Sequence, residues 1–269
     1  MASKKINELT SKTAVLNDSD YLMVYDSEEV GSEQTKKVAI SDYITVINQD
    51  LELNVATTGS DVTGDGSVGS PFATINGALE WCKNKTTNDG VTITITLAAG
   101  TWNDHPVINI YGGSSRIVIL GDFTTPSNVT INFATGSHGI NIYGPSMREF
   151  HIQGLTINGF DYTEWNSGIL TYYGAVVYLQ KVLISDFGNG VYAFFNSNII
   201  AKNGCTFDGG YNGAFAQNFS KIDLDGCTIS NNNNGISAQL RGEVMTDNCT
   251  FTGNSSNTWT ATGGVTAIY

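Results

Sequence analysis

The chain has 269 residues, of which 41% are hydrophobic, and its 25 acidic residues outnumber the 13 Lys and Arg residues, giving a net charge of −12. This length and apolar content suffice for a sizeable core. The acidic surface argues against nucleic acids and anionic membranes, which are bound through cations. No apolar run approaches the roughly 18 residues of a membrane span. We therefore expect no nucleic-acid partner and no membrane insertion.

Residues 1–53 differ in sequence pattern from the rest of the chain. They predict two strands, at 21–25 and 35–40, and a short helix at 42–47 capped by Ser41. The first residues lack the apolar core of a signal peptide, so we expect synthesis in a cytoplasm. We assign this segment to a small α+β module. It is too short for much core of its own and is expected to rest on a partner.

Residues 54–90 are expected to link this module to the next domain. A loop rich in Gly, Ser, Thr and Asp runs from 54 to 69, and a helix is predicted from about 72 to 85. Ile75, Ala78, Leu79 and Cys82 fall on one face of that helix. Its apolar face is suited to cover the open end of a stack of strands, whose unpaired edges otherwise invite aggregation.

From residue 91 the sequence alternates and then repeats itself. Strands are predicted at 91–97, 117–120, 129–133 and 140–143. Cys205, Cys227 and Cys249 recur at spacings of 227 − 205 = 22 and 249 − 227 = 22, and Asn-Gly recurs at 189–190, 212–213 and 234–235. A fixed period of this length indicates a stack of supersecondary units. Short strands separated by Gly/Asn/Asp turns predict an all-β, right-handed parallel β-helix of about eight coils over 91–269.

A leucine-rich-repeat solenoid is the alternative fold. Ile222, Leu224, Cys227, Ile229 and Asn232 imitate its repeat phrase. Residues 231–240 nevertheless read as asparagines and an alternating strand, where that fold needs a helical segment. The cysteines lack metal-ligand spacing and are interpreted as a column of packed thiols, so we expect no metal and no cofactor.

Two carboxylates are the catalytic candidates. Asp186 and Asp208 each follow a predicted strand, and the repeat would stack them one strand spacing apart. This approaches the roughly 5 Å separation in retaining glycosidases, and like charges at that distance raise one pKa. The alternative is that each aspartate caps a turn with its side chain.

Aromatic residues of the middle coils are the candidate carbohydrate ligands. The coil from Leu155 to Leu183 has a step of 183 − 155 = 28, against a period of 22, and the excess is expected in a loop at 159–167. Aromatic rings stack on the apolar faces of sugars, and carboxylates accept hydrogen bonds from sugar hydroxyls. The candidates in this region are Asp161, Tyr162, Glu164, Trp165, Tyr172 and Tyr173. Packing in the core or between subunits is the alternative for each ring.

Two segments carry a resemblance to a known family. The N-terminal KINELTSKTAVLNDSDYLMVYDSEEVGSEQTKKVAISDYI looks like a virion-anchoring segment, and NVATTGSDVTGDGSVGSPFATINGALEWCKN is similar to a lead-in with a capping helix. With the repeats, they resemble bacteriophage tailspike and tail-fibre proteins that carry a pectate-lyase-like β-helix. The resemblance implies a homotrimer in the virion tail. It further implies that residues 1–53 bind a tail or baseplate protein and that the β-helix faces a host surface glycan.

Three functions follow as hypotheses. The first is attachment of the virion to a host surface polysaccharide. The second is cleavage of that polysaccharide by a lyase or glycoside hydrolase on the same scaffold. The third is a structural tail spacer that binds no glycan.

Overall fold

The computed structural model describes residues 21–25, 35–39, 45–83, 85–87, 90–109, 116–134, 137–144, 149–160 and 166–268. The chain divides into two compact units. One unit comprises Met1–Val46 and Asn84–Thr86, and the other comprises Ile47–Lys83 and Thr87–Tyr269. Within the described ranges, no helix has both the length and the apolar content needed to span a membrane.

The first unit contains the two strands that the sequence predicts. β1 (Tyr21–Tyr25) pairs antiparallel with β2 (Thr35–Ala39). β3 (Thr45–Ile47) and β5 (Lys85–Thr87) form a second two-stranded sheet. The helix expected at 42–47 is therefore wrong over 45–47, where three β-branched residues favour an extended backbone. Its first residues, 42–44, and the capping Ser41 lie outside the described part.

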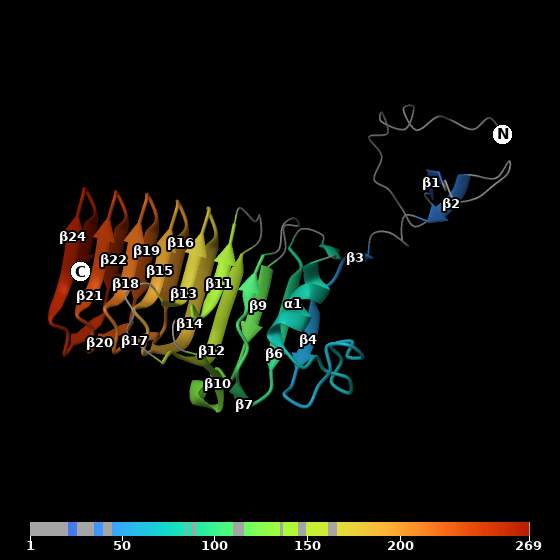
Figure 1. Ribbon diagram of the computed structural model, residues 1–269, viewed down its shortest axis with the longest axis horizontal. Helices are drawn as coiled ribbons and strands as arrows, with labels where there is room; N and C mark the ends of the chain where they lie inside the picture. The colour runs from blue at the N-terminus through green and yellow to red at the C-terminus, as the bar shows by residue number, and fades with distance from the viewer. Residues whose placement is uncertain are drawn as a thin grey trace. The chain divides into compact units, whose positions relative to one another are not determined.

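The second unit is a parallel β-helix, in which each coil contributes strands to three stacks (Figure 1). The first stack, in chain order, consists of β4 (Leu51–Val55), β6 (Thr92–Leu97), β9 (Arg116–Leu120), the first part of β12 (Phe150–Asn158), the first part of β14 (Val176–Ser185), β16 (Asn198–Lys202), β19 (Lys221–Asp225), β22 (Glu243–Asp247) and β25 (Val265–Ile268). Every pair in it is parallel and in register with the preceding coil.

The other two stacks complete each coil. The second consists of β7 (Gly100–Trp102), β10 (Val129–Asn132), which follows the short 3₁₀ helix η3 (Pro126–Asn128), the last parts of β12 and β14, β17 (Thr206–Asp208), β20 (Thr228–Ser230) and β23 (Thr250–Thr252). The third consists of β8 (Val107–Ile108), β11 (Ile140–Tyr143), β13 (Ser167–Tyr172), β15 (Asn189–Phe194), β18 (Asn212–Gln217), β21 (Asn234–Gln239) and β24 (Ser256–Ala261). Each coil has three strands, and Asn234–Gln239 is a strand where a leucine-rich repeat needs a helical segment. This excludes the leucine-rich-repeat alternative.

The 7-stranded third stack corresponds to about seven turns, against the eight expected from a uniform period. The reason is that the early coils are longer. Phe150 pairs with Ile117, so the step in that coil is 150 − 117 = 33. By contrast, Leu224 pairs with Ala201 and Thr246 with Leu224, giving steps of 224 − 201 = 23 and 246 − 224 = 22.

Buried side chains alternate with outward ones along most strands, and equivalent buried residues stack from coil to coil. The repeated cysteines form one such column. Cys205 and Cys227 are fully buried, Cys249 is half-buried, and all three are free thiols. The Sγ of Cys227 donates a hydrogen bond to the carbonyl oxygen of Ala201 at 3.4 Å. The cysteines are thus repeated core residues, as their spacing predicted.

The two residues of the repeated Asn-Gly pair have separate structural roles. The buried amides form a ladder, in which Asn212 Nδ2 donates to Asn189 Oδ1 at 2.8 Å and Asn234 Nδ2 donates to Asn212 Oδ1 at 3.1 Å. The glycine that follows allows adjacent backbones to approach, because a methyl group on Gly213 would lie 2.6 Å from the carbonyl oxygen of Gly235. Each of these coils therefore needs both residues at this corner.

Helix α1 (Ile75–Lys83) covers the start of the stack, and its buried residues are the four that the sequence placed on one face. It begins three residues later than expected because loop carboxylates bind the backbone N–H groups before and at its first turn. Asp61 Oδ1 accepts from Ala73 and Thr74, and Asp104 Oδ2 accepts from Ile75 at 2.7 Å. Carboxylates at this end of the helix also interact favourably with the positive end of its dipole.

The first coil starts earlier than the sequence division suggested. β4 crosses the boundary expected between residues 53 and 54 and pairs in parallel with β6, where Leu53 lies beside Ile95. Leu53 and Val55 are both buried. The β-helix unit accordingly begins at Ile47, inside the segment assigned to the N-terminal module.

Candidate functional site

The outer surface of the third stack carries a concentration of aromatic side chains. Alternation directs these rings outward, since Val191 and Ala193 are buried on either side of Tyr192 and Ala214 and Ala216 on either side of Phe215. We call the following set the aromatic face: Tyr143, Tyr172, Tyr192, Phe194, Phe215 and Trp259. The register of the third stack places these rings in two adjacent columns, with Tyr143, Tyr172 and Phe194 in one and Tyr192, Phe215 and Trp259 in the other.

Ring contacts connect most of the aromatic face. Tyr143 and Tyr172 stack with centroids 5.1 Å apart, and Tyr192 and Phe215 stack at 4.8 Å. Phe194 packs edge-on against Tyr172 at 5.7 Å. Such pairs contribute about 0.5–1.5 kcal/mol each beyond the area they bury. The rings therefore hold one another in place as a preformed apolar surface.

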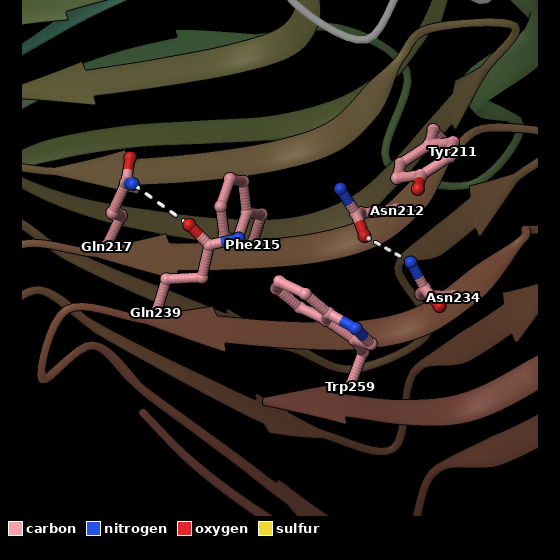
Figure 2. Close-up of a pocket in the computed structure, with 7 residues that line it drawn as sticks. All are labelled: Tyr211, Asn212, Phe215, Gln217, Asn234, Gln239 and Trp259. Carbon is pink, nitrogen blue, oxygen red and sulfur yellow. Dashed lines mark hydrogen bonds between the residues drawn. The ribbon is translucent and has the colours of Figure 1, made fainter. Parts of the chain in front are cut away.

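A pocket of about 190 Å³ opens at the C-terminal end of the aromatic face. Its lining consists of Tyr211, Asn212, Phe215, Gln217, Asn234, Gln239 and Trp259. Phe215 pairs with Ser237 and Ser237 pairs with Trp259, so the two rings stand two strands apart on either side of a small, buried serine. Figure 2 shows the Trp259 ring directed toward Phe215.

Hydrogen bonds fix the amides around the pocket, and Figure 2 marks two of them. Gln217 Nε2 donates to Gln239 Oε1 at 3.1 Å, and Asn234 Nδ2 donates to Asn212 Oδ1 at 3.1 Å. Tyr192 Oη donates to Gln217 Oε1. Burial, with a smaller effect of Tyr172, raises the pKa of Tyr192, so its hydroxyl stays protonated as a donor. The lining combines amides with aromatic rings and contains no charged side chain.

The predicted catalytic pair is not aligned as the sequence suggested. Asp208 pairs with Ser185 on one side and with Ser230 on the other, so Asp186 stands one position beyond the column of Asp208. Asp208 Oδ1 accepts hydrogen bonds from Ser230 Oγ at 2.5 Å and Asn231 Nδ2 at 2.8 Å. Both donors are side chains of the next coil, so Asp208 serves as an acceptor between coils. Catalysis by the pair stays a prediction.

Asp186 occupies a turn position with a left-handed backbone. Its φ is 62°, and the next residues of the column, Gly209, Asn231 and Gly253, have φ of 65°, 55° and 68°. Gly, Asn and Asp are the residue types that tolerate this region. The geometry of the turn thus accounts for the aspartate.

The six carbohydrate candidates divide between described and undescribed residues. Tyr172 belongs to the aromatic face, and Tyr173 lies beside it at a turn, half exposed and stacked on Phe195 at 5.5 Å. Asp161, Tyr162, Glu164 and Trp165 lie outside the described residues. Leu155 pairs with Val182, so the step of the long coil is 182 − 155 = 27, slightly shorter than the sequence suggested.

Sequence reasoning missed the pocket residues Tyr211, Phe215, Gln217, Gln239 and Trp259. A signal was present in the Asn-Gly landmark. The third residue after each landmark asparagine lies in the outward register, and these residues are Tyr192, Phe215 and Ser237. The same register leads to Trp259 in the next coil.

A group of titratable side chains in mutual contact lies on the outer surface of the first stack. Glu149 Oε2 binds Arg116 at 3.2 Å and His151 Nε2 at 3.4 Å, and the His151 ring stacks on Tyr178 at 4.5 Å. Burial lowers the pKa of His151, and the hydrogen bond to Glu149 opposes this effect. Among the described residues, no group of three or more His, Cys, Asp or Glu is placed to hold a metal ion.

Two solved structures are similar to this chain. A rhamnogalacturonan lyase gives a TM-score of 0.50 and 14% identity over 81% of this chain and 62% of that chain, so the chain spans less than two thirds of its length. The pectin methylesterase from Aspergillus niger gives a TM-score of 0.35 and 14% identity over 81% of this chain and 84% of that chain. No curated protein matches the sequence.

At 14% identity, the likeness to the lyase shows the fold alone. The family model is a stronger finding, because it covers more than half of the sequence. The model described as the right-handed β-helix region matches residues 107–269. This match includes the aromatic face and the pocket. The chain belongs to the right-handed β-helix family.

Proposed function

We propose that this chain binds a polysaccharide on its aromatic face and serves as the host-attachment part of a phage tailspike or tail fibre. One observation carries the proposal. A row of mutually packed rings stands on the outer surface of the third stack and leads into an uncharged pocket with fixed amides. Rings with polar edges suit the apolar faces and hydroxyls of sugars. A rigid scaffold presents them without ordering a loop on binding.

The proposed assembly is a homotrimer in the virion tail, with residues 1–53 bound to a tail or baseplate protein. Its support is the separate compact unit at the N-terminus together with the resemblance of this segment to virion anchors. A chain starting at Ile47 keeps β4 and should fold and bind glycan, yet fail to join virions. Solution mass should correspond to three chains. A monomer at micromolar concentration would contradict the trimer.

Glycan binding is tested with purified host surface polysaccharide and two matched ring variants. Trp259→Ala removes a pocket wall and should weaken retention of the protein on immobilised polysaccharide at least tenfold. Phe123→Ala removes an exposed ring from the loop between β9 and β10, outside the aromatic face, and should leave retention unchanged. Equal retention of both variants and the wild type would mean that the aromatic face does not bind the glycan. A protein that neither binds nor cleaves glycan would be the structural spacer.

Polysaccharide cleavage is the second candidate function, favoured by the group of Arg116, Glu149 and His151. A lyase needs a base that is neutral at working pH and a cation beside the substrate carboxylate, and this group contains both types. Incubation with a uronate-containing polysaccharide should then release shortened, unsaturated products that absorb in the ultraviolet. His151→Ala should stop their formation, with Asp208→Asn as the corresponding test of the predicted pair. Intact polysaccharide after long incubation excludes this function.

A further inference from the structure

The arrangement of amides at the pocket limits which sugar fits it. Gln217 takes part in a chain of hydrogen bonds, because its Oε1 accepts from Tyr192 and its Nε2 donates to Gln239. The Gln239 oxygen is thereby occupied, while its Nε2 has no hydrogen-bond partner within the residues that the structure describes. In Figure 2 the amide oxygen of Gln239 faces Gln217, and the nitrogen lies on the other side, toward Phe215.

The pocket therefore offers N–H donors next to aromatic walls. Trp259 and Tyr211 are 40% and 39% exposed, so their rings remain available to a ligand beside the Gln239 amide. A pocket of about 190 Å³ is smaller than the roughly 300–1,000 Å³ of sites for drug-sized ligands. It suits about one sugar ring with a small substituent.

A negatively charged sugar is a poor match for this site. The lining has no Lys, Arg or His to pair with a carboxylate, and the chain carries a net charge of −12. Burying an unpaired carboxylate is costly. A neutral group that combines a strong hydrogen-bond acceptor with an apolar methyl satisfies both the Gln239 donors and the rings.

Resting on the proposed glycan-binding function, we infer that the pocket is specific for an N-acetylated amino sugar. The acetyl carbonyl oxygen accepts a hydrogen bond from Gln239 Nε2, and the acetyl methyl and the sugar face pack against Trp259 and Phe215. Gln239 is the residue that determines this specificity.

The test uses three tetrasaccharides as probes, of which two are neutral and one is negatively charged. We expect the full-length protein to bind N-acetylchitotetraose about tenfold more tightly than cellotetraose in titration calorimetry, the worth of about one extra hydrogen bond with its packing. Tetragalacturonate should bind most weakly. The variant Gln239→Glu keeps the acceptor for Gln217 but removes the donor, so it should lose this preference without a change in melting temperature.

A matched control exists on the first stack, where Gln153 Nε2 donates to Gln180 Oε1 at 3.3 Å. Gln180→Glu introduces the same charge away from the pocket and should bind all three probes like the wild type. If Gln239→Glu lowers stability, Gln239→Met replaces it as the donor-free variant. Equal affinity for the N-acetylated and hydroxylated probes overturns the specificity but leaves glycan binding standing. Absence of binding to every probe, together with unchanged polysaccharide retention by Trp259→Ala, overturns both.

Discussion

Replacing Asn212 with leucine tests whether the buried amide ladder holds the coils together. Asn212 is only 5% exposed and takes part in three hydrogen bonds through its side chain. Its Nδ2 donates to Asn189, and its Oδ1 accepts from Asn234 and from Ser237. Leucine has a similar volume but can make none of these bonds. The substitution therefore removes three hydrogen bonds beside the core, and the buried donors of Asn234 and Ser237 lose the acceptor that Asn212 provides.

The magnitude follows from the two donors. An unsatisfied buried donor costs about 1–3 kcal/mol, so we expect a loss of about 2–6 kcal/mol. A domain's total stability is about 5–15 kcal/mol, so the effect would be large. Urea unfolding followed by circular dichroism measures it. Since each coil contacts only its neighbours, the coils around β18 should melt first.

Asn233→Leu is the matched control, because Asn233 lies in the next coil and is exposed. An exposed substitution of this kind changes stability by about 0.5 kcal/mol or less. A loss for Asn212→Leu no larger than this surface effect, or equal losses for the two variants, would refute the argument that the ladder stabilises the stack.

Three further predictions concern other parts of the β-helix. A hydrogen bond from Cys227 lowers the pKa of Cys249 to about 7, so Cys249 should react fastest with an alkylating reagent at neutral pH. Cys227 should stay protected until the protein unfolds. Peptide mass mapping measures both rates, and equal rates would contradict this prediction. Gly213→Ala should lower the melting temperature by several degrees because its methyl group meets backbone at 2.6 Å, whereas Gly226→Ala, with open space and a φ of 62°, should cost only about 1 kcal/mol. Burial lowers the pKa of His151 below its ordinary 6.5, so the unfolded chain binds more protons. Stability should therefore fall as pH drops below about 6.5, and His151→Asn should reduce that slope in urea titrations at pH 5 and 8.

The parts of the fold that the sequence predicted are those with a local periodic signal. The cysteine spacing placed one core column correctly, and the spacing of Ile75, Ala78, Leu79 and Cys82 identified the buried face of α1. Alternation marked most strands for the same reason. The number of turns was less accurate because loops in the early coils carry no periodic signal.

The misplacement of Asp186 has a specific physical cause. In later coils a Gly or Asn precedes the repeated cysteine. This residue takes a left-handed backbone, as Gly226 and Asn248 do at φ of 62° and 52°. In the coil of Asp186 this position is Lys181, with φ of 53°. Lysine gives no hint of such a bend, so the sequence indicates Leu183 as the equivalent of Cys205, whereas the strand register puts Val182 at that position. A shift of one residue exchanges inward and outward side chains.

The pocket could not be predicted because its residues come together only through the stacking of coils. Phe215 and Trp259 are far apart in the sequence and adjacent only across Ser237. The orientation of the Gln239 amide depends on Tyr192 and Gln217, which belong to two preceding coils. Residue types alone do not fix such a chain of donors and acceptors.

The in-register pairing of the later coils also determines which changes in chain length the protein can accept. The column Ala201, Leu224 and Thr246 repeats with steps of 224 − 201 = 23 and 246 − 224 = 22 along the sequence. Duplicating or deleting one whole coil would preserve every inward and outward position and alter only the height of the stack. Inserting a single residue within a strand would reverse its faces and expose the core. Proteins built in this way can therefore change their reach by recombination between coils while keeping an existing binding surface.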